Sequence, residues 1–237
     1  EVFDRVVFIR CKTDKEVPPP EGRNPDAEGG PARRFGVVSA TGFFLRDREE
    51  TYLVTARHVG VKLTPQASLS FVNEHCESRM IALGGLLREP ADLVWRHHET
   101  ADVSVVKIFP RGEPAKDVAA LCVEREALMS TPPSRGAQAM ACGFFMREGT
   151  HERIAPLVAT VHVASEVMPV AFDGTLIEAF LVHPPTGSGF SGGPVYWRDE
   201  GSGRSRCIGV TSGVIGDQSG GKFSTVMPCS MILDLLD

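Results

Sequence analysis

The sequence lacks long apolar runs and basic runs. No apolar stretch in the 237 residues approaches the roughly 20 residues that span a bilayer, so we expect no membrane-crossing helix. Lys and Arg number 25 against 30 Asp and Glu, which gives a formal net charge of −5. A mildly acidic chain without a basic run is a poor candidate for binding nucleic acid by charge. We therefore expect neither a membrane nor a nucleic-acid partner.

The six cysteines show no Cys-x-x-Cys spacing and are scattered along the chain. A chain of this length can bury its own core without disulfide bonds. Most of the cysteines are flanked by apolar residues, as buried thiols usually are. We therefore favour buried, reduced thiols over a disulfide framework at Cys11, Cys76, Cys122, Cys142, Cys207 and Cys229.

The apolar runs that are present are short and rich in Val, Ile, Thr and Phe. Several alternate apolar with polar residues, as half-buried antiparallel strands do, and 24 Gly and 17 Pro punctuate the gaps. The one convincing helix begins near Ser230, which we expect to cap it. The predicted strands are Val6–Cys11, Phe35–Leu45, Thr51–Thr55, Ser68–Val72, Arg79–Leu83, Val103–Phe109, Gln138–Met146, Ile154–Val167, Leu176–Val182, Pro194–Trp197, Cys207–Ser212 and Phe223–Met227.

Two stretches of different composition suggest how the chain is organised. Lys12–Arg34 is rich in Pro, Gly and charge and cannot bury enough apolar area, so we expect a long mobile loop. Arg111–Arg135 is rich in Pro and resembles a connection, with a short helix around Glu124–Met129. The expected organisation is an N-terminal β unit over 1–115, a connection over 116–135 and a C-terminal β unit over 136–237.

The run Gly189-Phe190-Ser191-Gly192-Gly193 has the composition of a nucleophile turn. A nucleophilic serine needs an exposed tight turn and backbone N–H groups that face the developing oxyanion. The N–H groups of Gly189 and Ser191 are placed to form such an oxyanion hole, since glycine permits the unusual dihedral angles. Ser188 lies nearby but lacks the following Gly-Gly pair.

A base and an acid precede this serine in the chain. His58 follows an alternating strand, and Asp102 stands just before the β-branched strand Val103–Phe109. Asp92 also precedes an apolar run, but that run is shorter, so we prefer Asp102. Each residue alone would be unremarkable in a turn, whereas the order His, Asp, Ser predicts a catalytic triad.

The other histidines offer no metal site. His97 and His98 are adjacent, so they would face opposite sides of a strand, and His75-Cys76 has no partner at zinc-ligand spacing. The mechanism suggested by the triad needs neither a metal nor an organic cofactor. We therefore expect no cofactor.

The three segments around His58, Asp102 and Ser191 resemble those of the trypsin/chymotrypsin-like serine peptidases. The resemblance spans Phe35 to the C-terminal helix and implies an all-β fold of two six-stranded antiparallel β-barrels with a C-terminal helix. Met140–Phe144 resembles the strand and turn that open the second barrel. By the same resemblance, a substrate-binding edge strand falls at Thr211, Ser212 and Gly213.

The departures from the family bear on selectivity and activation. Pro185 takes the pocket position where trypsin carries an acidic residue, which argues against selection for Lys or Arg. His183 lies on the segment that forms that pocket, although a surface position before Pro184 is the simpler account. Phe190 replaces the Asp that pairs with a newly cut amine in secreted members, so zymogen activation is not supported. These features resemble bacterial and intracellular members, and we expect a cytoplasmic protein.

The leading hypothesis is a serine endopeptidase that cleaves protein or peptide substrates. The alternative is a catalytically latent or inactive trypsin-fold module that binds peptides, or that an activating partner protein switches on. Phe190 keeps this alternative open, because a turn resting with a flipped peptide would form its oxyanion hole only on binding. An α/β-hydrolase esterase is excluded, because in that fold the serine precedes the acid and the histidine.

Overall fold

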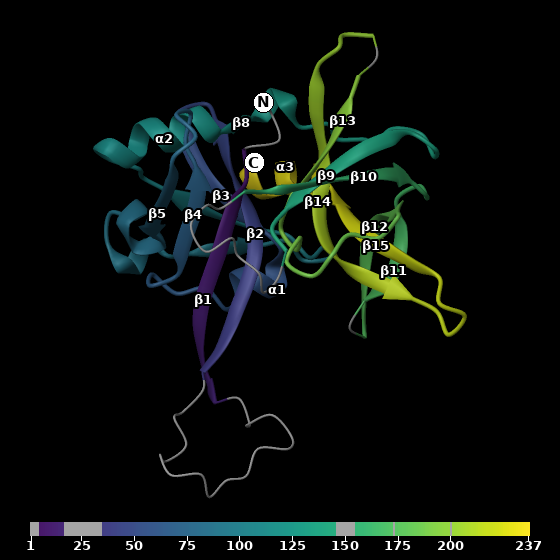
Figure 1. Ribbon diagram of the computed structural model, residues 1–237, viewed down its shortest axis with the longest axis horizontal. Helices are drawn as coiled ribbons and strands as arrows, with labels where there is room; N and C mark the ends of the chain where they lie inside the picture. Colours follow the sequence, from purple (N-terminus) through teal and green to yellow (C-terminus); the bar gives the residue numbers. More distant parts are fainter. Residues whose placement is uncertain (1–4, 17–34, 146–154, 173, 200) are drawn as a thin grey trace, which may run out of the picture.

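The computed structural model describes residues 5–16, 35–145, 155–172, 174–199 and 201–237, and strands are the main element of its two lobes (Figure 1). Three short α-helices accompany the strands, and short 3-10 turns lie at Leu83–Leu86, Pro90–Asp92 and Arg125–Ala127. The helices are α1 (Arg57–Gly60), α2 (Glu113–Leu121) and α3 (Ser230–Leu236).

The first sheet has the strand order β5-β4-β1-β2-β3-β7-β6, all antiparallel, and a short eighth strand pairs parallel with β2. Its strands are β1 (Val7–Glu16), β2 (Phe35–Asp47), β3 (Glu50–Thr55), β4 (Ser68–Val72), β5 (Ser78–Ala82), β6 (Trp95–His97), β7 (Ser104–Ile108) and β8 (Val123–Glu124).

The second sheet has the order β10-β9-β13-β14-β15-β12-β11, and an additional pairing of β10 with β12 closes it on itself. Its strands are β9 (Gln138–Gly143), β10 (Leu157–Val163), β11 (Met168–Phe172), β12 (Thr175–His183), β13 (Pro194–Arg198), β14 (Ser205–Gly216) and β15 (Lys222–Pro228).

The predicted all-β fold with a C-terminal helix is confirmed, and all twelve predicted strands are present with shifted ends. The described residues place eight and seven strands in the two sheets, where six each were expected. Two of the additional strands, β6 and β8, have only three and two residues, too few for a pattern to be visible. The third, β11, contains Pro169, which argues against a strand unless it lies at an edge, and β11 does lie at the end of its sheet.

Two local predictions were wrong, and one helix was not predicted. The segment Glu124–Met129 forms the end of β8 and a 3-10 turn, and the helix lies earlier, at α2. Pro114 suggested a loop there, but proline is well tolerated in the first turn of a helix. Ser230 does not cap α3, because the residue at the cap position is Cys229, without a side-chain cap.

Several strands lie within or next to the predicted loop and the predicted connection. The first strand continues through Lys12–Glu16, and the rest of the expected mobile loop, 17–34, lies outside the described residues. Strand β8 of the first sheet falls inside the expected connection 116–135, and the second sheet begins at Gln138.

The two sheets share one buried core. Inward-facing residues such as Phe43 of β2 and Tyr52 of β3 belong to the same apolar cluster as Tyr196 of β13 and Met227 of β15. Helix α3 packs on both β7 and β15, so it also bridges the sheets (Figure 1). This shared core fixes the loops of one sheet against those of the other, and the site described below lies where they meet.

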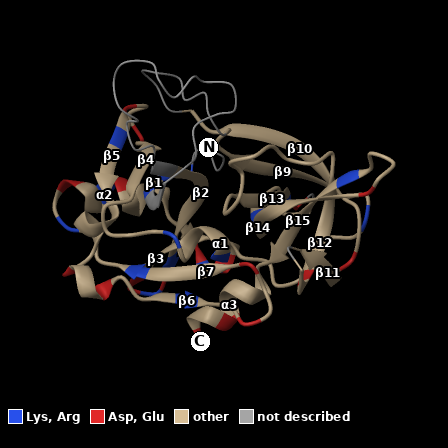
Figure 2. Cartoon of the chain, turned by 90° about the horizontal axis from the view of Figure 1, so that it is seen from below, with Lys and Arg blue, Asp and Glu red and all other residues tan. Residues whose placement is uncertain are grey.

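The described surface carries charges of both signs, and most of the cysteines are buried. Lys and Arg are interspersed with Asp and Glu around the periphery in Figure 2, without a large region of one sign. No helix among the described residues is long and apolar enough to cross a membrane. The six cysteines are all described, none forms a disulfide bond, and all except Cys76 are buried. Burial raises the pKa of the Cys122 thiol to about 11.

Candidate active site

His58 lies on the short helix α1, which follows β3 after a single residue. Strand β3 is anchored there because the Thr55 hydroxyl donates to the carbonyl oxygen of Thr41 at 2.8 Å. The helix packs closely on the first sheet, since a Cβ on Gly60 would lie 3.3 Å from both Ser104 and Trp95. The His58 side chain remains about one-third exposed, at 37%, and lines a surface cavity.

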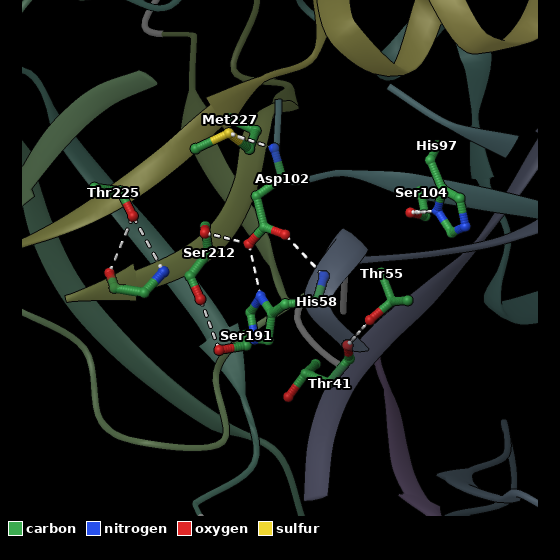
Figure 3. Close-up of polar contacts among 11 residues, drawn as sticks. Thr41, Thr55, His58, His97, Asp102, Ser104, Ser191, Ser212, Thr225 and Met227 are labelled. Carbon is green, nitrogen blue, oxygen red and sulfur yellow. Dashed lines mark hydrogen bonds and ion pairs between the residues drawn. The ribbon is translucent and has the colours of Figure 1, made fainter. Parts of the chain in front are cut away.

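Asp102 holds His58 through both of its carboxylate oxygens. Its Oδ1 accepts the backbone N–H of His58 at 2.8 Å, and its Oδ2 lies 2.7 Å from Nδ1 of the ring (Figure 3). The hydroxyl of Ser212 donates to the same Oδ2, and the N–H of Asp102 contacts Sδ of Met227 at 3.3 Å. The imidazole is therefore fixed in position and orientation by one nearly buried carboxylate.

The pKa of Asp102 lies below its ordinary value. Burial by itself raises this pKa, but the hydrogen bonds and charge of His58 and the hydroxyl of Ser212 lower it by more. The rival Asp92 lies in a 3-10 turn, where its carboxylate accepts the N–H of Glu89 at 3.3 Å. The structure thus places Asp102, and not Asp92, against the histidine.

Ser191 lies on a tight turn between β12 and β13. Gly189 and Gly192, on either side, have φ values of 101° and 89°, in the left-handed region that favours glycine. The Ser191 hydroxyl donates to the carbonyl oxygen of Ser212 at 2.6 Å, and among the described residues it has no hydrogen bond to His58. Ser212 is therefore hydrogen-bonded both to Ser191 and to Asp102, the residue that holds His58 (Figure 3).

Thr41 of β2 holds this turn against the first sheet. Its N–H donates to the Ser191 carbonyl at 2.9 Å, and its hydroxyl donates to the Gly189 carbonyl at 2.7 Å. Gly192 is so close that a Cβ there would lie 2.1 Å from the Thr41 carbonyl oxygen. Thr41 was not among the predicted site residues, because nothing in the run Ala40-Thr41-Gly42 marks it as a residue of the site.

The N–H groups of Gly189 and Ser191 make no hydrogen bond to a described residue. Two such donors on a glycine-rich turn are available to a ligand. Phe190, between them, is only 3% exposed and packs on Gly143, where a Cβ would lie 2.7 Å from the phenyl ring. The side chain of Phe190 therefore points into the second sheet's core and leaves the turn open.

A cavity of about 340 Å³ surrounds Ser191 and includes residues from both sheets. Three of the expected substrate-binding residues, Thr211, Ser212 and Gly213, line it, and Pro185 does not. The first sheet and α1 contribute Val37, Val38, Ser39, His58, Val59 and Lys62; the second contributes Thr186, Gly187, Ser188, Gly189, Ser191 and residues 211–214.

A second hollow, of about 310 Å³, lies on the other side of His58. Arg57, Glu99 and Asp102 line it together with Phe172 from β11. The Phe172 ring also covers Gly213, because a Cβ on that glycine would lie 2.4 Å from a ring atom. The hairpin that carries Phe172 thus forms one wall beside the edge of β14.

The remaining histidines among the described residues lie outside this cavity. His97 is hydrogen-bonded to the fully buried Ser104, and burial lowers the pKa of His97. His98 lies 3.5 Å from Asp234, and His183 packs against Phe223 on the surface. Among the described residues, no cluster of three or more His, Cys, Asp or Glu is positioned to hold a metal ion.

No protein-family model and no curated protein sequence matches the chain. Solved structures do resemble it. The chain is similar to the MamO protease domain from Magnetospirillum magneticum (apo form), with a TM-score of 0.61 and 18% identity over 100% of this chain and 97% of that one. It is also similar to the active form of the Rv3671c protease from M. tuberculosis, with a TM-score of 0.58 and 14% identity over 99% and 80%.

A third similar structure is the HtrA-type protease AlgW with tripeptide, with a TM-score of 0.57 and 13% identity. The chain matches it over 99% of its own length but spans only 59% of that longer chain. The chain has the chymotrypsin fold. His58, on the helix that follows a strand of the first sheet, and Ser191, on a turn of the second sheet, both line one cavity.

Proposed function

We propose that the protein is a serine endopeptidase with Ser191 as nucleophile, His58 as general base and Asp102 as the residue that orients His58. The observation that carries the proposal is the two-oxygen contact between Asp102 and His58, on the same cavity as a serine in a glycine-rich turn. A surface histidine alone needs no such buried partner, whereas a base that must gain and return a proton does.

In the proposed reaction, Asp102 holds the Nδ1–H of His58, which leaves Nε2 as the proton acceptor. Ser191 Oγ attacks the carbonyl carbon of the substrate while its proton passes to Nε2. The N–H groups of Gly189 and Ser191 stabilise the oxyanion, and loss of one such donor typically costs roughly 100- to 1,000-fold in turnover. His58 then protonates the leaving amine, and water hydrolyses the acyl-enzyme with His58 again as the base.

Before this reaction, the Ser191 side chain must rotate. In the resting state its hydroxyl donates to the Ser212 carbonyl, so its proton is held by an acceptor that takes no part in proton transfer. Rotation about one side-chain bond moves a serine hydroxyl between its staggered positions. We propose that such a rotation converts the resting arrangement into the catalytic one.

That same hydrogen bond favours a second candidate function. A chain in which Ser191 stays bound to Ser212 would be a latent or inactive trypsin-fold module that binds peptides or proteins. A bound peptide or an activating partner protein would shift the equilibrium if it favours the catalytic arrangement. Among the similar structures, the Rv3671c protease is described in both an active and an inactive form.

A fluorophosphonate probe distinguishes the two functions, because it reacts only with an activated serine. We expect labelling of the folded protein, and none in Ser191→Ala. The exposed Ser202 supplies a matched control, so Ser202→Ala should label like the parent. Labelling that requires an added protein or peptide would favour the latent module. No labelling under either condition would refute the endopeptidase.

A further inference from the structure

One buried hydroxyl in the cavity has no partner. Thr211 is 1% exposed, it lines the cavity that contains Ser191, and its Oγ1 has no hydrogen-bond partner among the described residues. Buried hydroxyl groups are nearly always hydrogen-bonded in folded proteins, because an unpaired one keeps its full desolvation cost. The unpaired Thr211 hydroxyl is therefore a candidate to form a hydrogen bond with a bound ligand.

The backbone fixes Thr211 beside the nucleophile turn. The Thr211 carbonyl accepts the N–H of Gly192 at 2.7 Å, and the Thr211 N–H donates to the carbonyl of Gly193 at 2.8 Å. The next residue, Ser212, accepts the hydroxyl of Ser191. Thr211 is therefore held on the strand directly beside the turn that carries Ser191.

The rest of this part of the cavity is uncharged. Thr186 also lines it, but its hydroxyl is already paired with that of the buried Ser224 at 2.9 Å, and Ser224 also accepts the Thr186 N–H. Residues 186–189 and 211–214 contribute no ionisable side chain. A substrate Lys or Arg would be buried there without a counter-charge, which is unfavourable, because no described acidic residue lines the cavity.

We propose that this cavity selects Ser, Thr or Asn as the acyl-side residue, meaning the residue whose carbonyl Ser191 attacks, and that Thr211 is the residue that recognises it. The inference rests on the proposed peptidase function. A hydroxyl group both donates and accepts, so it pairs with the hydroxyl or amide of such a side chain. The cavity, of about 340 Å³, is lined by residues of both sheets.

The test compares fluorogenic peptides that differ only in the acyl-side residue. Thr and Val have nearly the same size, so their ratio of kcat/KM isolates the hydroxyl. We expect Thr to be preferred by about tenfold, as for one hydrogen bond, and the ratio to fall to about one in Thr211→Val. The exposed Thr160 of β10 gives the control Thr160→Val, which should keep the parent ratio. Equal cleavage in the parent, or a ratio unchanged in Thr211→Val, would overturn the proposal.

A measurement of thermal stability tests whether the Thr211 hydroxyl is unpaired, and it does not depend on enzymatic activity. Thr211→Val replaces an unpaired buried hydroxyl with a methyl group, so we expect Tm to stay the same or rise. Thr225→Val is the matched change at a buried threonine whose hydroxyl is paired with the N–H and carbonyl of Gly213, and it should lower Tm. An equal loss of Tm in both variants would contradict an unpaired Thr211.

Failure of the proposed peptidase function can be told apart from failure of the proposed selectivity. If no peptide is cleaved and no fluorophosphonate reacts, the proposed function fails. Selectivity is then measured as binding of labelled peptides that end in Thr or Val to Ser191→Ala, by fluorescence anisotropy. We expect about tenfold tighter binding of the Thr peptide, a preference that Thr211→Val removes. Equal binding of the two peptides would refute the selectivity.

Discussion

The Ser191 hydroxyl donates to the carbonyl oxygen of Ser212 at 2.6 Å, while the Ser212 hydroxyl donates to Asp102. One residue of β14 thus contacts both the proposed nucleophile and the proposed acid. Its carbonyl accepts the Ser191 hydroxyl, and its own hydroxyl helps to keep the Asp102 carboxylate ionised. Changes at Ser212 and Asp102 should therefore affect activity and stability together.

Removing the Ser212 hydroxyl should weaken the support of Asp102. In Ser212→Ala, the carboxylate loses one donor at a nearly buried site, so we expect the free energy of unfolding to fall by about 1 to 2 kcal/mol. The pKa of Asp102 should rise toward its ordinary value, because a hydrogen bond to its charged form is lost. Urea denaturation of Ser212→Ala, Asp102→Asn and the double variant checks this. Strictly additive losses would mean that the two side chains are not coupled.

Asp102→Asn should leave the fold in place but lower kcat/KM by about 10⁴-fold, because an amide leaves the imidazole in the wrong tautomer. Peptide cleavage at neutral pH measures the loss. Asp92→Asn is the control, since Asp92 caps a 3-10 turn on the surface and should change kcat/KM little. A comparable loss in both variants would argue that Asp102 has no special part in the reaction.

The stability contributed by Asp102 should depend on pH in a definite direction. Its folded-state pKa is lowered from the ordinary value of about 3.9, so the unfolded chain binds the proton more readily. The contribution is therefore present above about pH 4 and is lost as the pH falls through the folded-state pKa. The unfolding free energy of the parent relative to Asp102→Asn should decline over that acidic range. A difference that grows on acidification would contradict this sign.

Gly192 should not tolerate a side chain. At φ 89°, Gly192→Ala would strain the backbone and would place Cβ 2.1 Å from the Thr41 carbonyl oxygen. Gly136 has φ 87° and open space around its Cβ position, so Gly136→Ala reports the strain alone. We expect a loss of about 1 kcal/mol for Gly136→Ala and about 2 to 5 kcal/mol for Gly192→Ala, with activity lost only in the latter. Thermal or urea unfolding measures both.

Arg125 should stabilise the junction between the first sheet and the following turn. Its guanidinium donates to the carboxylate of Asp47 at 2.9 Å, and the Asp47 side chain is only 10% exposed. Arg125→Ala would leave that carboxylate unpaired, at a cost of about 2 kcal/mol. The exposed pair of Arg135 with Glu166 is the control, and Arg135→Ala should change stability by less than about 0.5 kcal/mol. Equal losses would show that burial of Asp47 is unimportant.

Local signals in the sequence predicted a large part of the structure. Alternation of apolar residues predicted twelve strands, and the glycines around Ser191 predicted a tight turn, which is present. These features depend on a few neighbouring residues, because strand periodicity and glycine dihedral angles are local properties. Helix α2 was not predicted, because the proline-rich composition of Arg111–Arg135 suggested a connection, whereas Pro114 lies in the first helical turn, where proline is tolerated.

The contacts that complete the candidate site were decided by the tertiary structure. Thr41 reaches Gly189 across 148 residues of sequence, and Ser212 reaches Asp102 across 110. Nor could the sequence indicate that Thr211 would bury a hydroxyl without a partner, since that depends on what packs around it. By itself the sequence determined the residue types, their order and the local turn. The joining of two β-sheets over a shared core decided which of those residues meet, because contacts between distant segments form only when both sheets pack.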